Sequence, residues 1–569
     1  MRLLAATAMV FLAAFAAASP SAAQETDIPG NSSTRIVLRP GGSIYSTLKT
    51  VGDHDWIKAE LEAGTYQIQV HGVGLKELKD PRLTVYDGTG AWLGEVNDNE
   101  LTWGGANKTD PNAILSVFTP GTFYFDVSSF VAGATNDDTG DYLVTLAKSP
   151  GSRDVFMTLD GIAWQLTNNY SEWAGYGGAI AFTLGAERQL SYDVSKLTPA
   201  GAKLAVAALD AWSDVTGVKF VKVGPGSGQL DFYDNEPGEN AYVSLNVVGA
   251  SIASSNIMIT TGWLDQFGTS FGSHSYETYI QMVGRALGLG LAGNYSQATD
   301  SQYYKNDSPA YSVMSLSQAA NDEFTQGQGP SNPNVDASFR YMQTPSLADI
   351  IAIQKLYGAR TRTRRENTTY GFNADTGSRA LDGAARLGAD MFMCIYDDDG
   401  IDTLDLSRAR VRQLIDLRDG GYSNVLGGKM NLCIARGTTI ENAIGGSGKD
   451  RIIGNKSANR LTGGDGRDTF VFAMRLGEID RIEDFDASDD MIELSRSVFK
   501  ELAVGDLPRA AFKDLGVDGA RVDASDRIIY DRGTGALSYD PDGKGGEPAI
   551  RFATIRTKAR LSAANFVVR

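Results

Sequence analysis

The sequence predicts a multi-domain α+β protein with an antiparallel β-sandwich first, a mixed α/β domain next and turn-rich β structure last. Short apolar–polar alternations over residues 33–148 predict the sandwich. Helical periodicity mixed with strand-like runs marks residues 150–360, and glycine-rich and aspartate-rich turns mark 361–569. A chain of 569 residues is too long for one core, so two to four domains are expected.

The first residues are typical of a secretory signal peptide over 1–23. Arg2 precedes an apolar stretch, and the small residues Ser21, Ala22 and Ala23 predict cleavage after Ala23. No later segment has the roughly 20 apolar residues that a membrane span requires, so we expect an exported, soluble protein, extracellular or periplasmic. The only two cysteines, Cys394 and Cys433, could form a disulfide in such a compartment, but spacing alone leaves their pairing open.

The net charge is −17, from 69 acidic and 52 basic residues. This balance disfavours nucleic acid and anionic membranes as partners and suits a protein that binds cations. The alternative is an acidic surface that only keeps an exported protein in solution.

Four alternating runs in the first domain predict strands: "TYQIQVHGV", "RLTVYDGTG", "TFYFDVSSF" and "DYLVTLAK". With "GDHDWIKAELEAGTYQIQV" they resemble the bacterial pre-peptidase C-terminal domain, a small β-sandwich accessory module. Asp53 and Asp55 are candidate cation ligands there, although acids at a strand entry are more often solvated turn residues.

Three helices are predicted in the middle domain. "TPAGAKLAVAALDAWSDVTG" has helical spacing and ends at Gly217, and "SLADIIAIQKLYG" is a second helix. In "SYETYIQMVGRALGLG", Tyr276, Ile280, Val283 and Leu287 lie on one helical face before a glycine-rich exit.

The chain from about residue 155 to its end resembles the serralysins, secreted bacterial zinc proteases of the metzincin group. The resemblance rests on "LDAWSDVTGVKF", "SYETYIQMVGRALGLGLAGNY", "SPAYSVMSL", "LADIIAIQKLYGA", "GIDTLDLS" and "TIENAIGGSGKD". It implies a metzincin-like mixed α/β protease-like domain and a C-terminal parallel β-roll/β-sandwich.

The metzincin motif H-E-x-x-H-x-x-G-x-x-H supplies three histidine zinc ligands and a glutamate base, and a tyrosine follows the Met-turn. Here the segment is "QMVGRALGLGL". Carried across residue by residue, the ligand positions hold Gln281, Arg285 and Leu291, the base position holds Met282, and the tyrosine position holds Leu316. Gly288 and the Met-turn residue Met314 remain.

Each of these replacements removes a chemical role. Gln and Leu are poor or impossible zinc donors, and methionine takes no proton from water. A guanidinium about 4 Å from a divalent ion would repel it by roughly 8 kcal/mol at an effective dielectric near 20. The histidines His54, His71 and His274 lie elsewhere in the sequence. We therefore expect no zinc and no peptide hydrolysis. One hypothesis is that Arg285 replaces the zinc charge and pins its helix across the cleft; the alternative is that Arg285 points to solvent.

Three nine-residue units, 445–453, 454–462 and 463–471, resemble the repeats-in-toxin β-roll, which binds several Ca²⁺ ions. Each unit makes a half-turn, so residues 18 apart, such as Asp450 and Asp468, should stack and share an oxygen-lined site. Asn459 in the middle unit weakens the opposite face. The expected calcium residues of these units are Gly446, Gly448, Asp450, Gly464, Gly466 and Asp468.

Upstream, "YDDDGIDTLD" resembles the calcium loop of the family. The resemblance implies two neighbouring sites built from Arg365, Asn367, Thr369, Asp397, Asp399, Gly400, Asp402, Thr439 and Glu441. Asp484 and Asp490 could support a further, weaker site.

The leading interpretation is an exported calcium-binding pseudoprotease, for which a polypeptide or cell-surface protein is the expected partner. One alternative is an active secreted metalloendopeptidase with a non-standard metal site. Another is a calcium-stiffened surface or adhesive protein. Zinc with turnover would favour the first alternative over the leading interpretation.

Overall fold

In the computed structural model the chain divides into two units, Met1–Gly151 and Ser152–Arg569. The structure describes residues 28–569 apart from 97–111, 130–138, 149–156, 294–303, 320–330 and scattered gaps of one or two residues. The predicted signal peptide, residues 1–23, lies outside the described residues. Most of the described chain is β structure with some helices, as the sequence predicts, and no described helix has both the length and the hydropathy that a membrane crossing needs.

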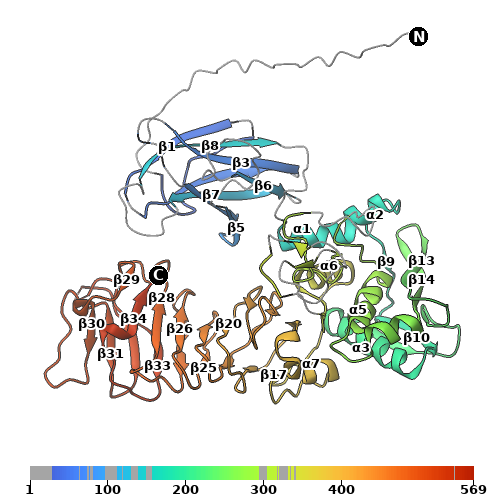
Figure 1. The fold of residues 1–569 in the computed structure, drawn as a ribbon. Coiled ribbons are helices and arrows are strands. Elements are labelled where there is room, and N and C mark those ends of the chain that lie inside the picture. The colour runs from blue at the N-terminus through green and yellow to red at the C-terminus, as the bar shows by residue number, and fades with distance from the viewer. Residues whose placement is uncertain are drawn as a thin grey trace, which may run out of the picture. The chain divides into compact units, whose positions relative to one another are not determined.

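The N-terminal unit contains two four-stranded antiparallel sheets (Figure 1). One sheet has the order β1-β8-β3-β6: Gly42–Leu48, Gly140–Lys148, Gly64–Gly72 and Asn112–Val117. The other has the order β2-β7-β4-β5: Asp55–Leu61, Gly121–Ser129, Pro81–Asp87 and Trp92–Val96. Apolar residues that alternate along the strands, such as Ile57, Val70, Phe125 and Val144, are fully buried in one core. The predicted strand runs correspond to β3, β4, β7 and β8.

The second unit begins with a six-stranded mixed sheet flanked by helices. Its strands follow the order β11-β10-β12-β14-β13, and β9 pairs with β14. The strand bounds are β9 Ala181–Phe182, β10 Gln189–Lys196, β11 Lys219–Lys222, β12 Leu230–Tyr233, β13 Ala241–Val248 and β14 Ser251–Ile259. The helices are α1 Leu159–Trp164, a π-helix at Gln165–Asn169, α2 Tyr170–Trp173, α3 Pro199–Thr216, α4 Thr261–Phe267, α5 His274–Ala286 and α6 Leu347–Tyr357. A short pair, β15 Gln318–Ala319 and β16 Ser331–Asn332, is parallel.

All three predicted helices of this region are confirmed as α3, α5 and α6. Helix α3 starts where the Thr198 side chain accepts a hydrogen bond from the backbone N–H of Gly201, and Pro199 occupies the first turn. It ends at Gly217, whose φ of 66° is left-handed and therefore suits glycine. Trp212 is fully buried and donates its Nε1–H to the carbonyl oxygen of Ile280, which ties α3 to α5.

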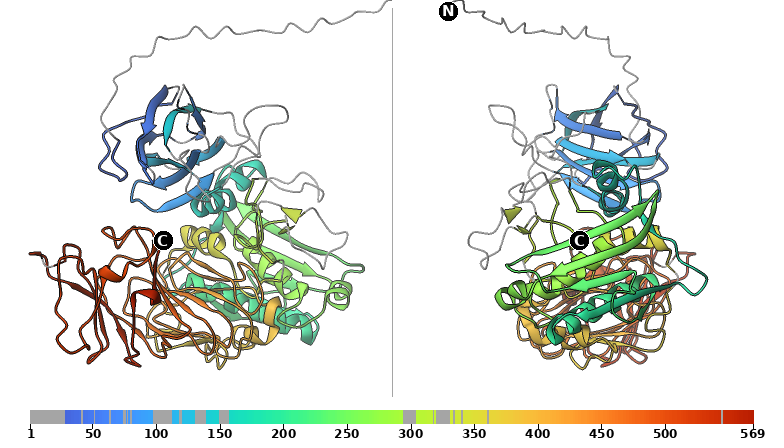
Figure 2. Two further views of the ribbon diagram at one scale, coloured as in Figure 1. Left: turned by 60° about the vertical axis from the view of Figure 1, so that its left-hand side comes forward. Right: turned by 90° about the vertical axis from the view of Figure 1, so that its right-hand side faces the viewer.

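The C-terminal part is built from short strands that alternate between two sheets along the chain and mostly pair in parallel (Figure 1, Figure 2). Some pairs near the C-terminus are antiparallel. One sheet has the order β17-β19-β23-β25-β27-β33-β32-β31-β30, from Thr369–Gly371, Thr403–Asp405, Asn442–Ile444, Arg460–Thr462, Asp480–Ile482, Ile550–Ile555, Ala536–Tyr539, Ile528–Asp531 and Phe512–Asp514. The other has the order β20-β24-β26-β28-β34-β29, from Leu414–Asp416, Arg451–Ile453, Thr469–Phe472, Met491–Leu494, Phe566–Val568 and Gly505–Asp506. Arg451 pairs with Thr469 and Asn442 pairs with Arg460, so the predicted stacking of residues 18 apart is confirmed.

A three-stranded sheet separates two hydrophobic cores within the second unit. It has the order β18-β22-β21: Met393–Ile395, Leu432–Ile434 and Tyr422–Ser423. Because side chains alternate along a strand, Cys394 and Cys433 enter the core of the helical part, whereas Met393 and Ile395 enter the core of the roll. The predicted boundary at 360/361 therefore lies inside one compact unit, and the segment around 392–435 belongs to both cores.

Cys394 and Cys433 are register partners on adjacent parallel strands, yet both are buried free thiols. The disulfide that the sequence left open is thus not formed in the structure.

Candidate functional site

Helix α5 is the segment that the family resemblance assigns to zinc. Ser273 caps it by accepting a hydrogen bond from the backbone N–H of Tyr276. The chain leaves the helix through Gly288, which has a φ of +107°. A Cβ at Gly288 would lie 2.2 Å from the carbonyl oxygen of Ile180, so both the backbone angle and the close approach require glycine here.

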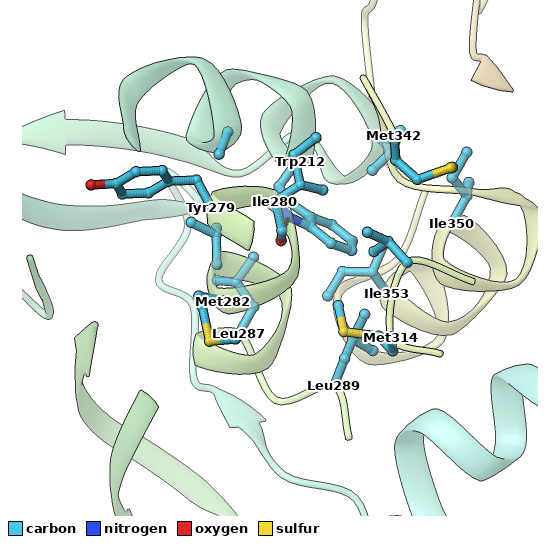
Figure 3. Packing of buried hydrophobic residues seen from close by; sticks show 14 of the residues in the cluster. Trp212, Tyr279, Ile280, Met282, Leu287, Leu289, Met314, Met342, Ile350 and Ile353 are labelled. Carbon is cyan, nitrogen blue, oxygen red and sulfur yellow. Dashed lines mark hydrogen bonds between the residues drawn. The ribbon is translucent and has the colours of Figure 1, made fainter. Parts of the chain in front are cut away.

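Met314 packs directly under α5. A Cβ placed on Gly284 would lie 2.3 Å from Met314 Cε and 2.5 Å from Trp212 Cζ2. Figure 3 shows Trp212, Ile280 and Met314 within this core. The turn that carries Met314 is held in turn by Asp349, whose carboxylate accepts hydrogen bonds from Ser312 Oγ and from the Val313 backbone N–H.

The side chains at the five replaced positions differ in burial and in their contacts. The Gln281 amide Nε2 donates to the Val313 carbonyl oxygen at 2.9 Å, just before the Met-turn methionine. Met282 is buried, Leu291 is half-buried, and Leu316 is 41% exposed. Across the residues that the structure describes, no group of three or more His, Cys, Asp or Glu side chains is placed to hold a metal ion.

Arg285 does not make the contact that the pinning hypothesis requires. It lies half-buried in the last turn of α5, and within the described part of the chain no ion pair or hydrogen bond joins its guanidinium to a neighbour. A cation in the last turn is favoured by the helix dipole, which gives Arg285 a local role without a partner across the cleft. The hypothesis of a pinned helix is therefore wrong for the described residues.

The histidines and the sandwich acids serve local structure. His274 Nδ1 lies 3.2 Å from Glu277 Oε2, and its ring contacts Trp263 and Tyr341. His54 Nδ1 lies 2.9 Å from Asp126 Oδ2, and that hydrogen bond raises the pKa of His54.

Asp53 and Asp55 likewise accept hydrogen bonds from their own unit. Asp53 accepts from the backbone N–H groups of Lys49 and His54, and Asp55 is buried and accepts from Tyr142 Oη. Both acids bind donors of their own unit, but Asp55 is fully buried and is therefore not the solvated turn residue that its position suggested.

The expected calcium loop is assembled from two segments far apart in sequence. Asp402 accepts a hydrogen bond from the Thr368 backbone N–H through Oδ1, and Asn367 Oδ1 accepts from the Ile401 N–H. Asp397 accepts from Tyr370 Oη at 2.6 Å. Burial raises the pKa of Asp397 to about 6, and burial together with the charges of Asp397 and Glu441 raises that of Asp402 to about 7.

The remaining predicted loop residues are placed less uniformly. Glu441 Oε2 accepts from the Asp402 N–H, so the two proposed neighbouring sites adjoin. Asp399 is exposed, and one of its carboxylate oxygens lies 3.7 Å from a side-chain nitrogen of Arg365. Gly400 has a φ of +133°, and a Cβ there would lie 2.8 Å from Asp402 Oδ1. Thr369 begins β17, and Thr439 is half-buried beside Glu441.

In the nine-residue units the aspartates form a ladder across successive turns, which we call the aspartate ladder: Asp450, Asp468 and Asp490. The backbone N–H of Gln413 donates to Asp450 Oδ1, that of Asp450 to Asp468 Oδ1, and that of Asp468 to Asp490 Oδ1. Asp468 is 1% exposed, and its Oδ2 has no hydrogen-bond donor. Burial and the neighbouring aspartates raise the pKa of Asp468 to about 7.

Glycines bring the carbonyls of one turn close to the next turn. A Cβ at Gly464 would lie 1.9 Å from the carbonyl oxygen of Gly446, and one at Gly466 would lie 2.1 Å from that of Gly448. Buried carboxylates without cationic partners, next to close-packed carbonyls, are the oxygen donors that a hard cation such as Ca²⁺ prefers. Within the aspartate ladder this description applies to Asp468 Oδ2, whereas both oxygens of Asp450 and of Asp490 already accept hydrogen bonds.

Further residues near the aspartate ladder and the Met-turn were partly predicted and partly missed. Asp484 accepts from the backbone N–H groups of Gly463 and Gly464, which fills its oxygens with turn donors. Asn459 accepts from the Asn455 N–H, so the opposite face carries an amide where the repeat expects a carboxylate. Sequence reasoning missed Asp349 and Gln413, although the Ser346–Asp349 capping-box spacing marks the first of them.

Comparison with known proteins gives the following matches. Residues 359–508 match the family described as Peptidase M10 serralysin C terminal. Metallopeptidase AprA of Pseudomonas marginalis is 36% identical over 266 residues, covering 45% of this chain and 54% of that protein. Metalloprotease AprA of Pseudomonas entomophila is 32% identical over 383 residues, covering 61% of this chain and 75% of that protein. The chain thus spans about half the length of the first relative and three quarters of the second.

Among solved structures, the pre-peptidase C-terminal domain of collagenase from Bacillus anthracis matches 20% of this chain and 92% of its own length, at 13% identity and a TM-score of 0.14. That score is too low to support any inference about the N-terminal unit.

Proposed function

The chain belongs to the serralysin family, and from that premise we propose that it is an exported calcium-binding member that does not hydrolyse peptides. The observation that carries this proposal is the state of α5. Gln281 uses its amide on the Val313 carbonyl, and the other four replaced positions offer thioether, guanidinium or alkyl groups. None of these groups is an imidazole, a thiolate or a carboxylate, which are the ligands that zinc prefers.

The scaffold around those positions supports loss of chemistry on a retained fold. Gly288 and Gly284 keep contacts that a larger side chain would disrupt, and Met314 keeps its place under the helix. A folded but uncatalytic cleft is consistent with a role in binding or scaffolding a polypeptide. The base position supports the same conclusion, since Met282 is buried and cannot accept a proton from water.

Calcium binding is the second part of the proposal. The aspartate ladder and the loop of Asp397 and Asp402 hold carboxylates whose pKa values are raised by burial and by neighbouring carboxylates. When bound, calcium would supply the positive charge that these oxygens lack. Asp468, with its donor-free Oδ2, is the residue that we expect to contact the ion most directly.

The test is elemental analysis of the purified mature protein for zinc and calcium, with a casein assay on the same sample. We expect several calcium ions, no stoichiometric zinc and no turnover. One zinc per chain with turnover would overturn the proposal.

A matched variant makes the negative result informative. Gln281→His, Met282→Glu, Arg285→His and Leu291→His together rebuild the family motif on the same scaffold. We expect this quadruple variant to bind one zinc, because Gly288 and Met314 still shape the site. If it binds no zinc, the loss of zinc cannot be assigned to the side chains alone.

A further inference from the structure

A large groove runs along the face of α3 that points away from α5. Its volume is about 1280 Å³, and it is lined by α3, by the edge around β11, by residues 361–364 and by the start of α7 (Arg379–Ala384). Leu204, Ala208 and Trp212 of α3 are buried in the core. Ala202, Val206 and Ala207 line the groove, and the two alanines also pack against the edge of that core. The groove is therefore separate from the degenerate zinc helix, and its occupancy does not depend on the function proposed above.

The charge of the groove is opposite to that of the protein. Seven basic and three acidic side chains line it, a balance of seven minus three, or +4, in a chain of net charge −17. The three acids are Glu187, Asp210 and Asp214.

Two of the seven cationic side chains bind groups of the protein itself. Arg364 is ion-paired to Asp214 and donates to the Tyr396 carbonyl oxygen at 2.9 Å. Arg188 donates through Nη2 to the carbonyl oxygens of Thr216 and Tyr357. Both side chains hold the walls of the groove together and are not available to a ligand as free charges.

The other five cations are exposed, and they share the groove with two acids, Glu187 and Asp210, to which no ion pair joins them among the described residues. The five are Lys203, Lys219, Lys222, Arg362 and Arg379. In the described part of the chain none of the five has a carboxylate within ion-pair distance. An excess of cations around one recess of an acidic protein raises the local concentration of an anionic partner.

We propose that this groove binds an acidic segment of a partner polypeptide. Its volume exceeds that of a site for a small molecule, and the apolar floor of Ala202, Val206 and Ala207 accommodates small apolar side chains between acidic ones. The acidic side chains then pair with the lysines and arginines at the rim.

Two other anionic partners fit the groove less well. Sugars stack on open aromatic rings, but Phe271, the single aromatic ring in the lining that the structure describes, is covered by Lys203 Nζ at 4.4 Å from the ring centroid. A flat bilayer contacts protruding surfaces, whereas here the apolar residues form the floor of a recess.

The test measures fluorescence anisotropy of a labelled peptide of alternating Glu and Ala, added to the mature protein in excess calcium. We expect saturable binding that weakens as salt rises. The triple variant Lys203→Gln, Lys219→Gln and Lys222→Gln should lose roughly tenfold in affinity, since three rim charges are removed. Lys456→Gln with Lys500→Gln removes exposed cations elsewhere and should change the affinity by less than about twofold.

A second variant tests the floor. Ala207→Glu places a negative charge in the groove without altering the rim cations and should also weaken the peptide. Equal losses in the triple variant and the Lys456/Lys500 control would show unspecific attraction and overturn the proposal. It is likewise overturned if a sulfated polysaccharide or phosphatidylserine vesicles bind more tightly than the peptide in a manner that the triple variant abolishes.

Discussion

At the scale of single residues, Asp349 shows how the turn that carries Met314 is held in place. It is fully buried at the start of α6, and its carboxylate accepts hydrogen bonds from Ser312 Oγ and from the backbone N–H groups of Val313 and Ser346. Burial raises its pKa to about 6 despite these three donors. The Met-turn is thus fixed by a carboxylate on a neighbouring helix.

The raised pKa of Asp349 gives a pH dependence of known sign. The pKa is about 3.9 in the unfolded chain, so the folded protein binds more protons between about pH 4 and 6. The stability contribution of this group is therefore present below about pH 4 and is lost as the pH rises through about 6. The change is about 3 kcal/mol for a shift of about two units.

The measurement is urea unfolding of the wild type and of Asp349→Asn from pH 4 to pH 8. We expect the variant to be less stable at every pH, because its amide nitrogen cannot accept the backbone donors. The stability gap should narrow as the pH rises. A gap that stays constant would mean that Asp349 does not titrate in this range.

Gly284 is the second residue whose surroundings permit a sharp prediction. The substitution Gly284→Ala forces a Cβ against Met314 Cε and Trp212 Cζ2 and should destabilise the protein by about 1–3 kcal/mol through overpacking. Gly383→Ala in α7 is the matched control, because no atom lies within 4 Å of its Cβ position. There the helix gains about 0.5–1 kcal/mol from the lost glycine flexibility. In thermal unfolding, Gly284→Ala should lower the Tm and Gly383→Ala should raise it.

At the scale of elements, the aspartate ladder joins successive turns of the roll through backbone N–H donors. Each turn depends on the carboxylate of the next, and the repulsion among these carboxylates remains until a cation neutralises it. We expect calcium to stabilise the roll by linkage, by about 3 kcal/mol when its concentration exceeds the dissociation constant a hundredfold.

The substitution Asp468→Asn separates the repulsion between the carboxylates from the stabilisation by calcium. It removes a buried negative charge, so the calcium-free protein should unfold at a higher temperature than the calcium-free wild type. The same change removes a ligand oxygen, so the rise in Tm on adding calcium should shrink. Asp465→Asn removes an equal charge from an exposed position outside the ladder and should leave both values unchanged. A full calcium response in Asp468→Asn would contradict the assignment of Asp468 as a ligand.

Elements with a local sequence pattern could be predicted from the sequence, whereas long-range contacts and very short strands could not. Helices α3, α5 and α6 and the 18-residue stacking follow from local periodicity, which the residues of one segment carry by themselves. The meeting of the segment 365–369 with Asp402 is a long-range contact that only the family resemblance suggested, and the residue whose backbone N–H donates to Asp402, Thr368, was not among the predicted ones. Strand β18 was not predicted, since three residues between a helix and an acidic loop have too little pattern to show a strand.

At the scale of the whole molecule, the segment around 392–435 joins the cleft to the roll. Gln343 and Phe392 exchange two backbone and side-chain hydrogen bonds, and Cys394 N–H donates to Thr344 Oγ1. Tyr422 Oη donates to the Ala310 carbonyl oxygen, a few residues before Met314. The sequence placed a domain boundary at 360/361 because composition changes there, but composition does not report on which residues complete a core.

Because the segment around 392–435 belongs to both cores, we can predict how fragments of the chain will fold. A fragment of residues 152–569 retains every contact of its compact unit and should unfold cooperatively. A fragment of residues 152–360 loses Phe392, Cys394, Tyr396 and Cys433 from its core, which leaves the Met-turn side of that core open to water. We expect the shorter fragment to lose near-UV circular dichroism and to bind the dye ANS, because apolar surface is exposed. If residues 152–360 instead show a sharp thermal transition, the contacts across the three-stranded sheet add little, and the cleft is stable without the roll. The expected result would mean that the cleft depends on the roll for its stability, since the strands that complete the core of the cleft also belong to the core of the roll.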